Sequence, residues 1–276
     1  MRTDSGVRTD SGVRSDSGVR TDESRGGDRR WARTPPARVV RELLICGVFR
    51  SIIRTYSRTE IVGREQLEQL AGPAIFVANH CSHVDTPVLL GSLPARWRRR
   101  TAVAAAADYF YTTPLLADSV SLAFGTVPLE RRGNGMGTDA DHIERLIGRG
   151  WSLVVFAEGT RSRDGRLGRM RSGAAVLAAR HGLPIVPIHI SGTHRAMPIG
   201  RAWMSRPEGG GRWARHTIRV SFGAPIHLGP LDDRQEAMIR VRRLMESCGA
   251  DLAPAMTPLP VLPAPPERRS AETPSR

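Results

Sequence analysis

The hydrophobic positions of the 276-residue chain fall into short runs that predict strands, separated by segments with helical spacing. Apolar segments that predict strands occur at 74–78, within 122–129, and at 185–190 and 217–222, and the continuous apolar run at 152–156 is typical of a strand buried on both faces of a sheet. Helical patterns occupy 85–93, 138–147 and 171–181, and a closing helix has an apolar face formed by Met238, Val241, Leu244, Met245 and Cys248. This alternation predicts an α/β fold: a single domain with a largely parallel or mixed sheet flanked by helices.

The segment 38–57 has a different pattern. It is helical in character and apolar almost all round, but Arg38, Arg41, Arg50 and Arg54 interrupt it. Its longest uncharged run, 43–49, is far too short to span a bilayer. Two interpretations stay open: an interfacial helix whose arginines reach lipid phosphates, or a helix packed on the domain core.

Both ends of the chain lack such patterns. Residues 1–37 contain a six-residue repeat, Arg-Thr-Asp-Ser-Gly-Val, which offers one apolar side chain per unit and cannot build a core. Residues 253–276 contain seven prolines. We predict a disordered tail at each end and place the folded domain at 58–252. The polar N-terminus is unlike a signal peptide, and no apolar stretch is long enough to span a membrane, so we expect an intracellular protein.

The charge balance narrows the class of ligand. The net charge is +14, and every one of the 41 basic residues is Arg, which excludes a Walker phosphate loop and lysine chemistry. The two ends carry only +2 and +1, so residues 38–253 carry +11 and favour an anionic partner. Only 5% of the residues are aromatic and no nucleic-acid-binding module is found, so we expect no nucleic acid. A solvated basic surface without a ligand stays open.

The most specific motif, N-H-C-S-H-V-D, covers 79–85 and follows the first predicted strand. Asp85, at the start of the next helix, can hold one imidazole nitrogen of His80 while the other nitrogen takes a proton. No Gly-x-Ser-x-Gly elbow supplies a nucleophile, so the pair indicates attack by a substrate hydroxyl under general-base catalysis. Three alternatives stay open: a capping box of Ser82 and Asp85, a metal site that includes His83, and a core histidine.

A second motif, E-G-T-R, covers 158–161 and follows the strand at 152–156. Gly159 permits a tight turn, and Thr160, Arg161 and backbone amides can hold an anion. An ordinary turn is the alternative. A third segment, 125–131, begins with Gly and ends with Arg at the end of another strand.

In this order, the segments resemble the glycerolipid acyltransferase family, typified by lysophosphatidic acid (1-acylglycerol-3-phosphate) acyltransferase. Four blocks carry the resemblance, over roughly 58–228. The matching residues are Asn79, His80, Ser82 and Asp85 in the first block, Gly125 and Arg131 in the second, Phe156, Glu158, Gly159, Thr160, Arg161 and Ser162 in the third, and Val186 and Pro187 in the fourth. Ala157 replaces a Pro of the third block, and Arg171 stands where the family often carries Lys.

The resemblance implies transfer of a fatty acyl group from acyl-CoA or acyl-carrier protein to the hydroxyl of lysophosphatidate, a step of phospholipid biosynthesis. It implies that His80 is the general base, oriented by Asp85, and that Arg131 and Arg161 bind the acceptor phosphate. The pocket would be shaped by Glu158, Gly159 and Thr160, and supported by Asn79, Ser82, Gly125 and Pro187. No metal or organic cofactor is expected, because a thioester is already activated.

Two rival functions remain: an acyltransferase for another lysolipid or a glycolipid, and a non-catalytic Arg-rich protein that binds membranes or nucleic acid. The intact His80–Asp85 pair argues against the second, since binding needs no base. We expect peripheral association with an anionic membrane surface at the cytoplasmic face of the cell membrane. The expected contacts are Arg96, Arg98, Arg99 and Arg100 together with the apolar side chains of Leu43, Leu44, Ile45, Phe49 and Ile52.

Overall fold

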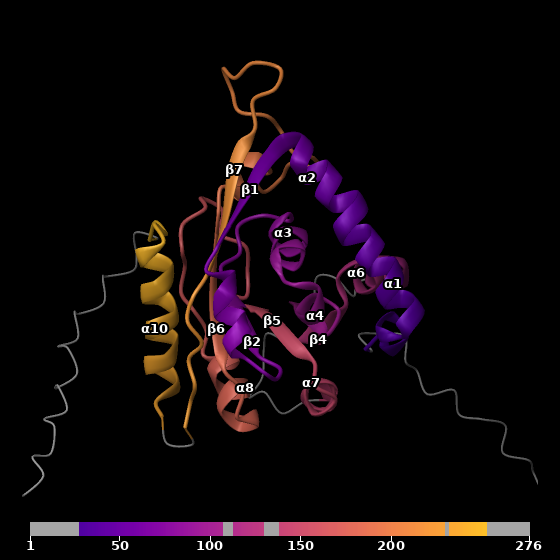
Figure 1. Ribbon diagram of the computed structural model, residues 1–276, viewed down its shortest axis with the longest axis vertical. Helices are drawn as coiled ribbons and strands as arrows, with labels where there is room; N and C mark the ends of the chain where they lie inside the picture. Colours follow the sequence, from indigo (N-terminus) through magenta and orange to yellow (C-terminus); the bar gives the residue numbers. More distant parts are fainter. Residues whose placement is uncertain (1–27, 107–112, 130–137, 230–231, 253–276) are drawn as a thin grey trace, which may run out of the picture.

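A seven-stranded sheet forms the centre of the computed structural model, which describes residues 28–106, 113–129, 138–229 and 232–252 (Figure 1). The strand order is β1-β7-β6-β2-β5-β3-β4, and neighbouring strands are parallel except for β6 and β7. This confirms the predicted α/β class with a mixed, largely parallel sheet. The strands are β1 (Ser57–Val62), β2 (Ile75–Ala78), β3 (Thr101–Ala106), β4 (Thr126–Leu129), β5 (Ser152–Phe156), β6 (Ile185–Ser191) and β7 (His216–Phe222).

Helices cover both faces of this sheet (Figure 1). Side chains of α3 and α4 and of the long N-terminal helix enter one hydrophobic cluster, and those of α7, α8 and α10 enter the other. The helical elements are η1 (Arg30–Arg33), α1 (Pro35–Leu43), η2 (Leu44–Phe49), α2 (Arg50–Tyr56), η3 (Arg64–Gln69), α3 (Asp85–Ser92), α4 (Ala95–Arg98), α6 (Pro114–Phe124), α7 (Thr138–Gly148), α8 (Gly173–His181), α9 (Thr193–Ala196) and α10 (Arg234–Ser247).

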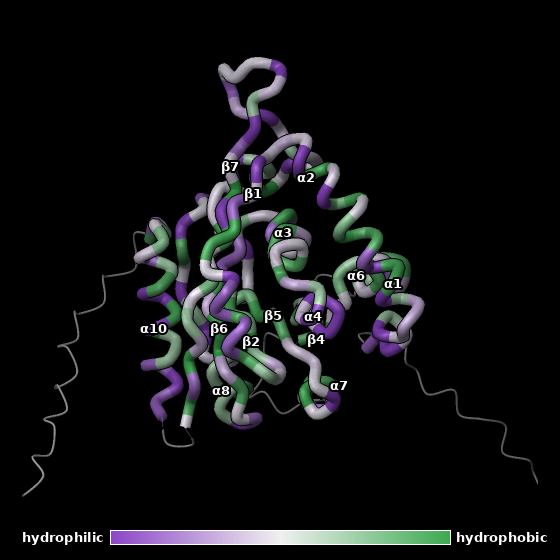
Figure 2. The backbone as a smooth tube through the Cα atoms, in the orientation of Figure 1, coloured by the Kyte–Doolittle hydropathy of each residue, from purple (hydrophilic) through white to green (hydrophobic). Residues whose placement is uncertain are grey.

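The central strands are apolar throughout because both of their faces are covered. In β2, Phe76 and Ala78 belong to the cluster below α3, and Ile75 and Val77 belong to the cluster below α8. Hydrophobic segments lie in the middle of the molecule and also along the N-terminal helix (Figure 2). Continuous apolar runs locate β2, β5 and β6 in the sequence, whereas in β7 the exposed Thr217 and Arg219 alternate with buried residues.

Two strands do not follow from the apolar pattern. β1 is an edge strand of largely polar sequence, half-exposed along its length. β3 reads TAVAAA, and alanine favours helices more than strands. The segment 122–129 also divides: α6 ends at Phe124, Gly125 adopts a left-handed conformation with φ of 67°, and β4 begins at Thr126.

The N-terminal helix begins earlier than the sequence predicts. The predicted tail extends to residue 37, but α1 starts at Pro35, where a proline at the first turn leaves no N–H unsatisfied and favours the helix. From there α1, the π-helical η2 and α2 form one continuous helix to Tyr56. The rest of the predicted N-terminal tail, 1–27, and the predicted Pro-rich tail, 253–276, lie outside the described residues.

This helix is anchored on the core. Ile45 and Ile53 are only 1% and 6% exposed, and Phe49 packs on Phe124 with ring centroids 5.3 Å apart. Arg41 is buried and donates hydrogen bonds to the carbonyl oxygens of residues 32, 121 and 122, and burial lowers its pKa to about 10. One face of the helix therefore packs on the domain core. Ile45 cannot enter a membrane, contrary to the expectation from the sequence, because it is enclosed by the core.

Candidate active site

The candidate site lies where β2 and β5 end, at the carboxyl edge of the parallel strands. The two loops that follow these strands are tied together by backbone hydrogen bonds. The Ala157 N–H donates to the Ala78 carbonyl at 2.9 Å, and the Ser162 N–H donates to the His80 carbonyl at 2.8 Å. The two strongest motifs of the sequence, at 79–85 and 158–161, are thereby brought together.

His80 and Asp85 form the predicted pair. The distance from His80 Nδ1 to Asp85 Oδ2 is 2.9 Å, and the Asp85 side chain is fully buried. The same oxygen accepts the backbone N–H groups of Cys81 and Ser82 at 2.7 and 2.8 Å. Since a carboxylate only accepts, Nδ1 carries the proton and Nε2 holds the lone pair of the neutral ring. His80 therefore has the orientation that a general base requires.

The contacts of Ser82 and His83 bear on the capping-box and metal alternatives for this motif. Asp85 does accept the Ser82 N–H, as in a capping box, while Ser82 Oγ donates to the Met197 carbonyl at 2.7 Å and accepts the Val84 N–H at 3.4 Å. The His83 ring bonds Arg161 through its Nε2 atom. Within the described ranges, no group of three or more His, Cys, Asp or Glu side chains is placed to hold a metal ion.

Asn79 joins the loop that contains His80 to β6. Its side-chain amide donates to the Ile190 carbonyl at 2.8 Å and accepts the Ile190 N–H at 2.7 Å.

Pro187, predicted as a supporting residue, lies in β6 beside Val77 of β2. Its carbonyl accepts the Gly223 N–H. The antiparallel pairing of β6 with β7 begins only at Ile188. Pro187, which has no N–H, therefore interrupts no hydrogen bond between these two strands.

Glu158 holds the backbone of both motifs. One carboxylate oxygen accepts the His80 N–H at 3.1 Å, and the other accepts the Gly168 N–H at 2.9 Å. Burial raises the pKa of this carboxyl. The resemblance suggests that Glu158 shapes the substrate pocket, and these contacts allow it to do so by fixing the position of His80.

The turn after Glu158 needs glycine. Gly159 has φ of 70°, in the left-handed region. A Cβ at this position would also lie only 3.0 Å from Arg171 Nε, so the arginine side chain lies against the turn. The turn thus places the cation of Arg171 beside residues 158–161.

A cavity of about 290 Å³ opens in front of His80, and we call it the His80 cavity. Its lining includes Phe156, Thr160 and Arg161 as well as His80. The imidazole is stacked on Phe156, with ring centroids 4.0 Å apart and an angle of 19° between the planes. Arg161 contacts the Nε2 atom of His83, and burial together with the charge of Arg161 lowers the pKa of His83. A base and a cation therefore border the same space.

The stacking of Phe156 on His80 and the contact of His83 with Arg161 are not predicted from the sequence, which offers Phe156 only as a residue of the third block and His83 only as a metal ligand. The position of Phe156 follows only from the register of the sheet. In that register Phe156 pairs with Ala78, which lies two residues before His80.

Arg131, the second predicted phosphate ligand, lies outside the described residues. Gly125 has a structural role, because a Cβ there would lie 3.0 Å from the Arg41 guanidinium carbon.

Comparisons with known proteins agree with this geometry. The family model described as Acyltransferase matches residues 58–191. The chain is 35% identical over 151 residues to the chloroplastic 1-acyl-sn-glycerol-3-phosphate acyltransferase BAT2 of Brassica napus, an alignment that covers 54% of this chain and 41% of that protein. It is 32% identical over 177 residues to the chloroplastic enzyme LPAT1 of Arabidopsis thaliana, covering 63% and 45%. The chain thus spans less than half the length of these curated relatives.

The fold has a solved counterpart. The 1-acyl-sn-glycerophosphate acyltransferase PlsC of Thermotoga maritima superimposes with a TM-score of 0.57 at 23% identity, over 82% of this chain and 85% of that one. This likeness supports the architecture, and the family model covers the blocks that contain His80, Asp85 and Arg161. Residues 58–191 are therefore similar in sequence to the Acyltransferase family, over the segment that contains the candidate site.

Proposed function

We propose that the protein transfers a fatty acyl group from acyl-CoA or acyl-carrier protein to the free hydroxyl of lysophosphatidate. The observation that carries this proposal is the His80–Asp85 pair, which faces a cavity whose border contains Arg161. The relatives named 1-acyl-sn-glycerol-3-phosphate acyltransferase support the choice of acceptor. A mere binding protein would not need an imidazole held in this tautomer by a buried carboxylate.

The proposed reaction uses His80 twice. Nε2 takes the proton of the acceptor hydroxyl as its oxygen bonds to the thioester carbonyl carbon. The tetrahedral intermediate then collapses, the carbon–sulfur bond breaks, and the thiolate takes the proton back from the imidazolium. The products are the new ester and the free thiol of the donor, and His80 is again neutral. Asp85 stabilises the imidazolium between the two steps. No metal or organic cofactor enters, because the thioester is already activated.

An acyl-transfer assay tests the proposal directly. Purified protein is incubated with lysophosphatidate and either acyl-CoA or acyl-carrier protein, and thiol release and lipid product are measured. Other lysolipids and a glycolipid form the comparison panel. Faster turnover with lysophosphatidate than with the panel is expected; preference for a phosphate-free acceptor would favour the rival acyltransferase. No transfer to any acceptor would favour the non-catalytic alternative.

Replacing Arg161 by alanine should weaken acceptor binding. Arg161 borders the His80 cavity, and a hydrogen bond between charged groups is worth roughly 1.5–3 kcal/mol. We therefore expect the KM for lysophosphatidate to rise about 10- to 100-fold with a smaller change in kcat. Steady-state kinetics over a range of acceptor concentrations measure this. If a phosphate-free acceptor suffers equally, Arg161 supports the loop through His83 and does not bind the phosphate.

We further propose that the protein works peripherally on an anionic membrane surface. None of the described helices combines the length and the apolar character needed to cross a bilayer. The N-terminal helix, however, turns a stripe of apolar side chains outward. Val39, Val40, Leu43 and Val48 are 61%, 42%, 67% and 50% exposed. An interfacial helix inserts such a stripe below the headgroups. The inserted side chains are thus mostly different from those expected from the sequence.

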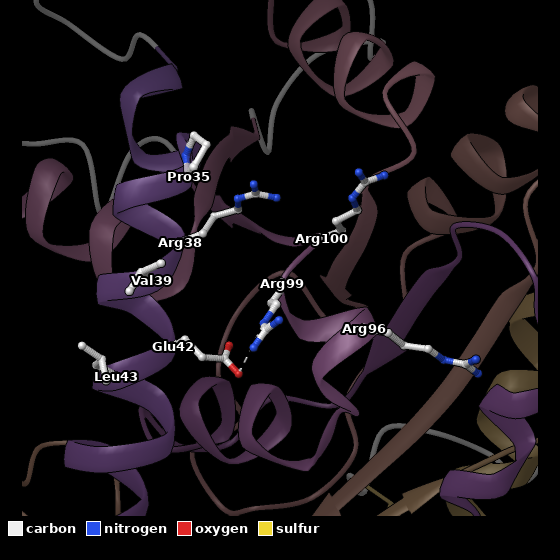
Figure 3. Close-up of a pocket in the computed structure, with 8 residues that line it drawn as sticks. All are labelled: Pro35, Arg38, Val39, Glu42, Leu43, Arg96, Arg99 and Arg100. Atoms are coloured by element: carbon white, nitrogen blue, oxygen red, sulfur yellow. Dashed lines mark ion pairs between the residues drawn. The ribbon is translucent and has the colours of Figure 1, made fainter.

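A basic groove of about 530 Å³, here called the α1 groove, lies beside this stripe (Figure 3). Arg38, Arg99 and Arg100 border it, and Arg38 Nε is buried without a hydrogen-bond partner among the described residues. The acidic residue of the groove, Glu42, is bonded by Arg98, which lowers its pKa, and also pairs with Arg99 at 3.9 Å (Figure 3). One carboxylate thus faces several arginines, and the surplus positive charge of the groove suits lipid phosphates. The cytoplasmic leaflet carries the anionic lipids, so we place the protein on that face.

Leu43→Ser should weaken membrane binding at every salt concentration. Full burial of a leucine side chain is worth roughly 1.5–3 kcal/mol, so we expect about a tenfold loss of partitioning into anionic vesicles, measured by co-sedimentation. Arg99→Gln should weaken binding in low salt and have little effect in high salt, because its contribution is screened.

Val176→Ser is the matched control, since Val176 is an exposed apolar residue of α8, which packs on the opposite face of the sheet. Equal vesicle binding by Leu43→Ser and Val176→Ser would contradict the proposed contact. Deleting 38–56 would not be informative, because it removes Ile45 and Ile53 from the core.

A further inference from the structure

A second cavity lies on the other side of the 158–161 turn. It measures about 810 Å³ and is bordered by α10 and by the segment 168–172, which leads from the turn to the N-terminus of α8; we call it the α8–α10 cavity. Three arginines line it: Arg169, Arg171 and Arg242. The proposed chemistry at His80 uses none of them. α8 and α10 pack against each other and against β6, so two sides of this cavity are firmly held (Figure 1).

The charge in this cavity is strongly positive. Glu158 also lines it, but both of its carboxylate oxygens accept backbone N–H groups, those of His80 and Gly168. Arg169 and Arg171 are exposed at the cavity border. Two cations at the border of a concave site favour an anionic ligand.

Arg242 is the unusual member of the group. It is 7% exposed, and its Nε donates to Glu246 at 2.7 Å. Its Nη2 is buried and has no hydrogen-bond partner among the described residues. A buried hydrogen-bond donor without an acceptor lowers the stability of the folded protein by roughly 1–3 kcal/mol, and by more when the group is charged. An anion bound in the cavity would supply the acceptor that the protein does not.

The N-terminus of α8 also favours an anionic ligand in this cavity. α8 begins at Gly173, with Ser172 at its N-cap, and Ser172 also lines the cavity. The first turn of α8 contains no acidic residue, and the Ser172 side chain makes no capping hydrogen bond. The positive end of the helix dipole is therefore available to an anion. Together with the buried Arg242, it makes this a site for a phosphate.

The position of the cavity relates it to the reaction. Thr160 lines both the α8–α10 cavity and the His80 cavity, so a single turn separates the two. One phosphate, that of the acceptor, is already assigned to Arg161 on the His80 side. The other substrate also carries a phosphate: coenzyme A and acyl-carrier protein share a 4′-phosphopantetheine arm, whose long flexible chain ends in the thioester.

We propose that the α8–α10 cavity binds the phosphate of the donor's 4′-phosphopantetheine arm. This inference rests on the proposed function. Arg171 and Arg242 hold the phosphate at the start of α8, and the arm passes Thr160 to bring the thioester carbonyl to His80. The 158–161 turn then separates the two substrates, with the donor phosphate on one side and the acceptor phosphate on the other.

Direct binding tests the site without requiring turnover. Coenzyme A, 4′-phosphopantetheine and phosphate-free pantetheine are titrated into the full-length protein by calorimetry, and holo- and apo-acyl-carrier protein form a separate arm. We expect the two phosphorylated small molecules to bind and pantetheine to bind at least tenfold more weakly. Binding of coenzyme A alone would assign the nucleotide phosphates to the cavity and would overturn the arm-phosphate proposal.

Arg171→Gln and Arg242→Gln should each raise the dissociation constant for coenzyme A about tenfold or more. The KM for the acyl donor should rise by a similar factor. The KM for lysophosphatidate should stay unchanged. Arg240→Gln is the matched control, because Arg240 is an exposed arginine of the same helix that does not line the cavity. Thermal unfolding shows whether Arg242→Gln is folded, and Arg171→Gln tests the site at an exposed position.

The outcomes separate this inference from the proposed function. If lysophosphatidate is acylated but Arg171→Gln and folded Arg242→Gln bind coenzyme A as the unmodified protein does, the donor site is wrong and the function stands. If coenzyme A binding depends on both arginines but no lysolipid is acylated, the site stands and the acceptor assignment is wrong. Equal losses in Arg240→Gln would indicate general attraction to a basic surface and would overturn the site.

Discussion

His80→Ala should abolish acyl transfer and leave the fold intact. In the proposed reaction, His80 takes the hydroxyl proton and returns it to the leaving thiol, and general-base help of this kind is worth roughly 10²- to 10⁴-fold in rate. The backbone bonds that fix the loop, from the His80 N–H to Glu158 and from the Ser162 N–H to the His80 carbonyl, do not involve the imidazole. Asp85 also keeps two backbone donors.

The measurement is thiol release under saturating donor and acceptor, together with thermal unfolding. Loss of the imidazole removes one hydrogen bond to Asp85 and the stacking on Phe156, so we expect destabilisation of about 1–3 kcal/mol. His227→Ala is the matched control, because His227 is exposed and outside the His80 cavity. Near-normal turnover by a folded His80→Ala protein would exclude the general-base mechanism.

The sequence locates the His80–Asp85 pair because its two members lie on one strand–loop–helix unit. His80 follows β2 and Asp85 begins α3, so the contact depends on local geometry, and the structure confirms it at 2.9 Å. The meeting of this loop with the 158–161 turn follows from the parallel pairing of β2 and β5. Carboxyl ends of neighbouring parallel strands lie at one edge, so this also could be predicted from an α/β pattern.

Contacts that depend on side-chain packing could not be predicted in this way. The N-terminal helix is apolar almost all round, and no pattern tells whether Ile45 or Leu43 faces the core; the structure buries the first and exposes the second. Arg242 belongs to a helix whose sequence is mostly polar on its outer face, and only packing against α8 makes it a buried cation in a cavity. The α8–α10 cavity therefore has no signal in the sequence.

Asp85→Asn should reduce the rate strongly, and the structure indicates why. Changing a carboxylate to an amide often turns an N–H toward the imidazole and selects the wrong tautomer. Here Asp85 Oδ2 accepts His80 Nδ1 and the backbone N–H groups of Cys81 and Ser82 together. An amide nitrogen cannot face two N–H donors, so the asparagine oxygen is expected to occupy this position and to keep the His80 tautomer.

The expected loss in Asp85→Asn is then the loss of charge. At an effective dielectric constant of about 20, a carboxylate near 4 Å from the imidazolium charge is worth roughly 4 kcal/mol, so kcat should fall about 10²- to 10³-fold. Thermal unfolding should change little, because the three hydrogen bonds remain. Asp85→Ala provides the contrast: it leaves the Cys81 and Ser82 N–H groups buried without an acceptor, at about 1–3 kcal/mol each, and should lower the unfolding temperature clearly. A folded Asp85→Asn protein with unchanged kcat would show that the buried carboxylate only holds the loop, and that His80 does not become charged during the reaction.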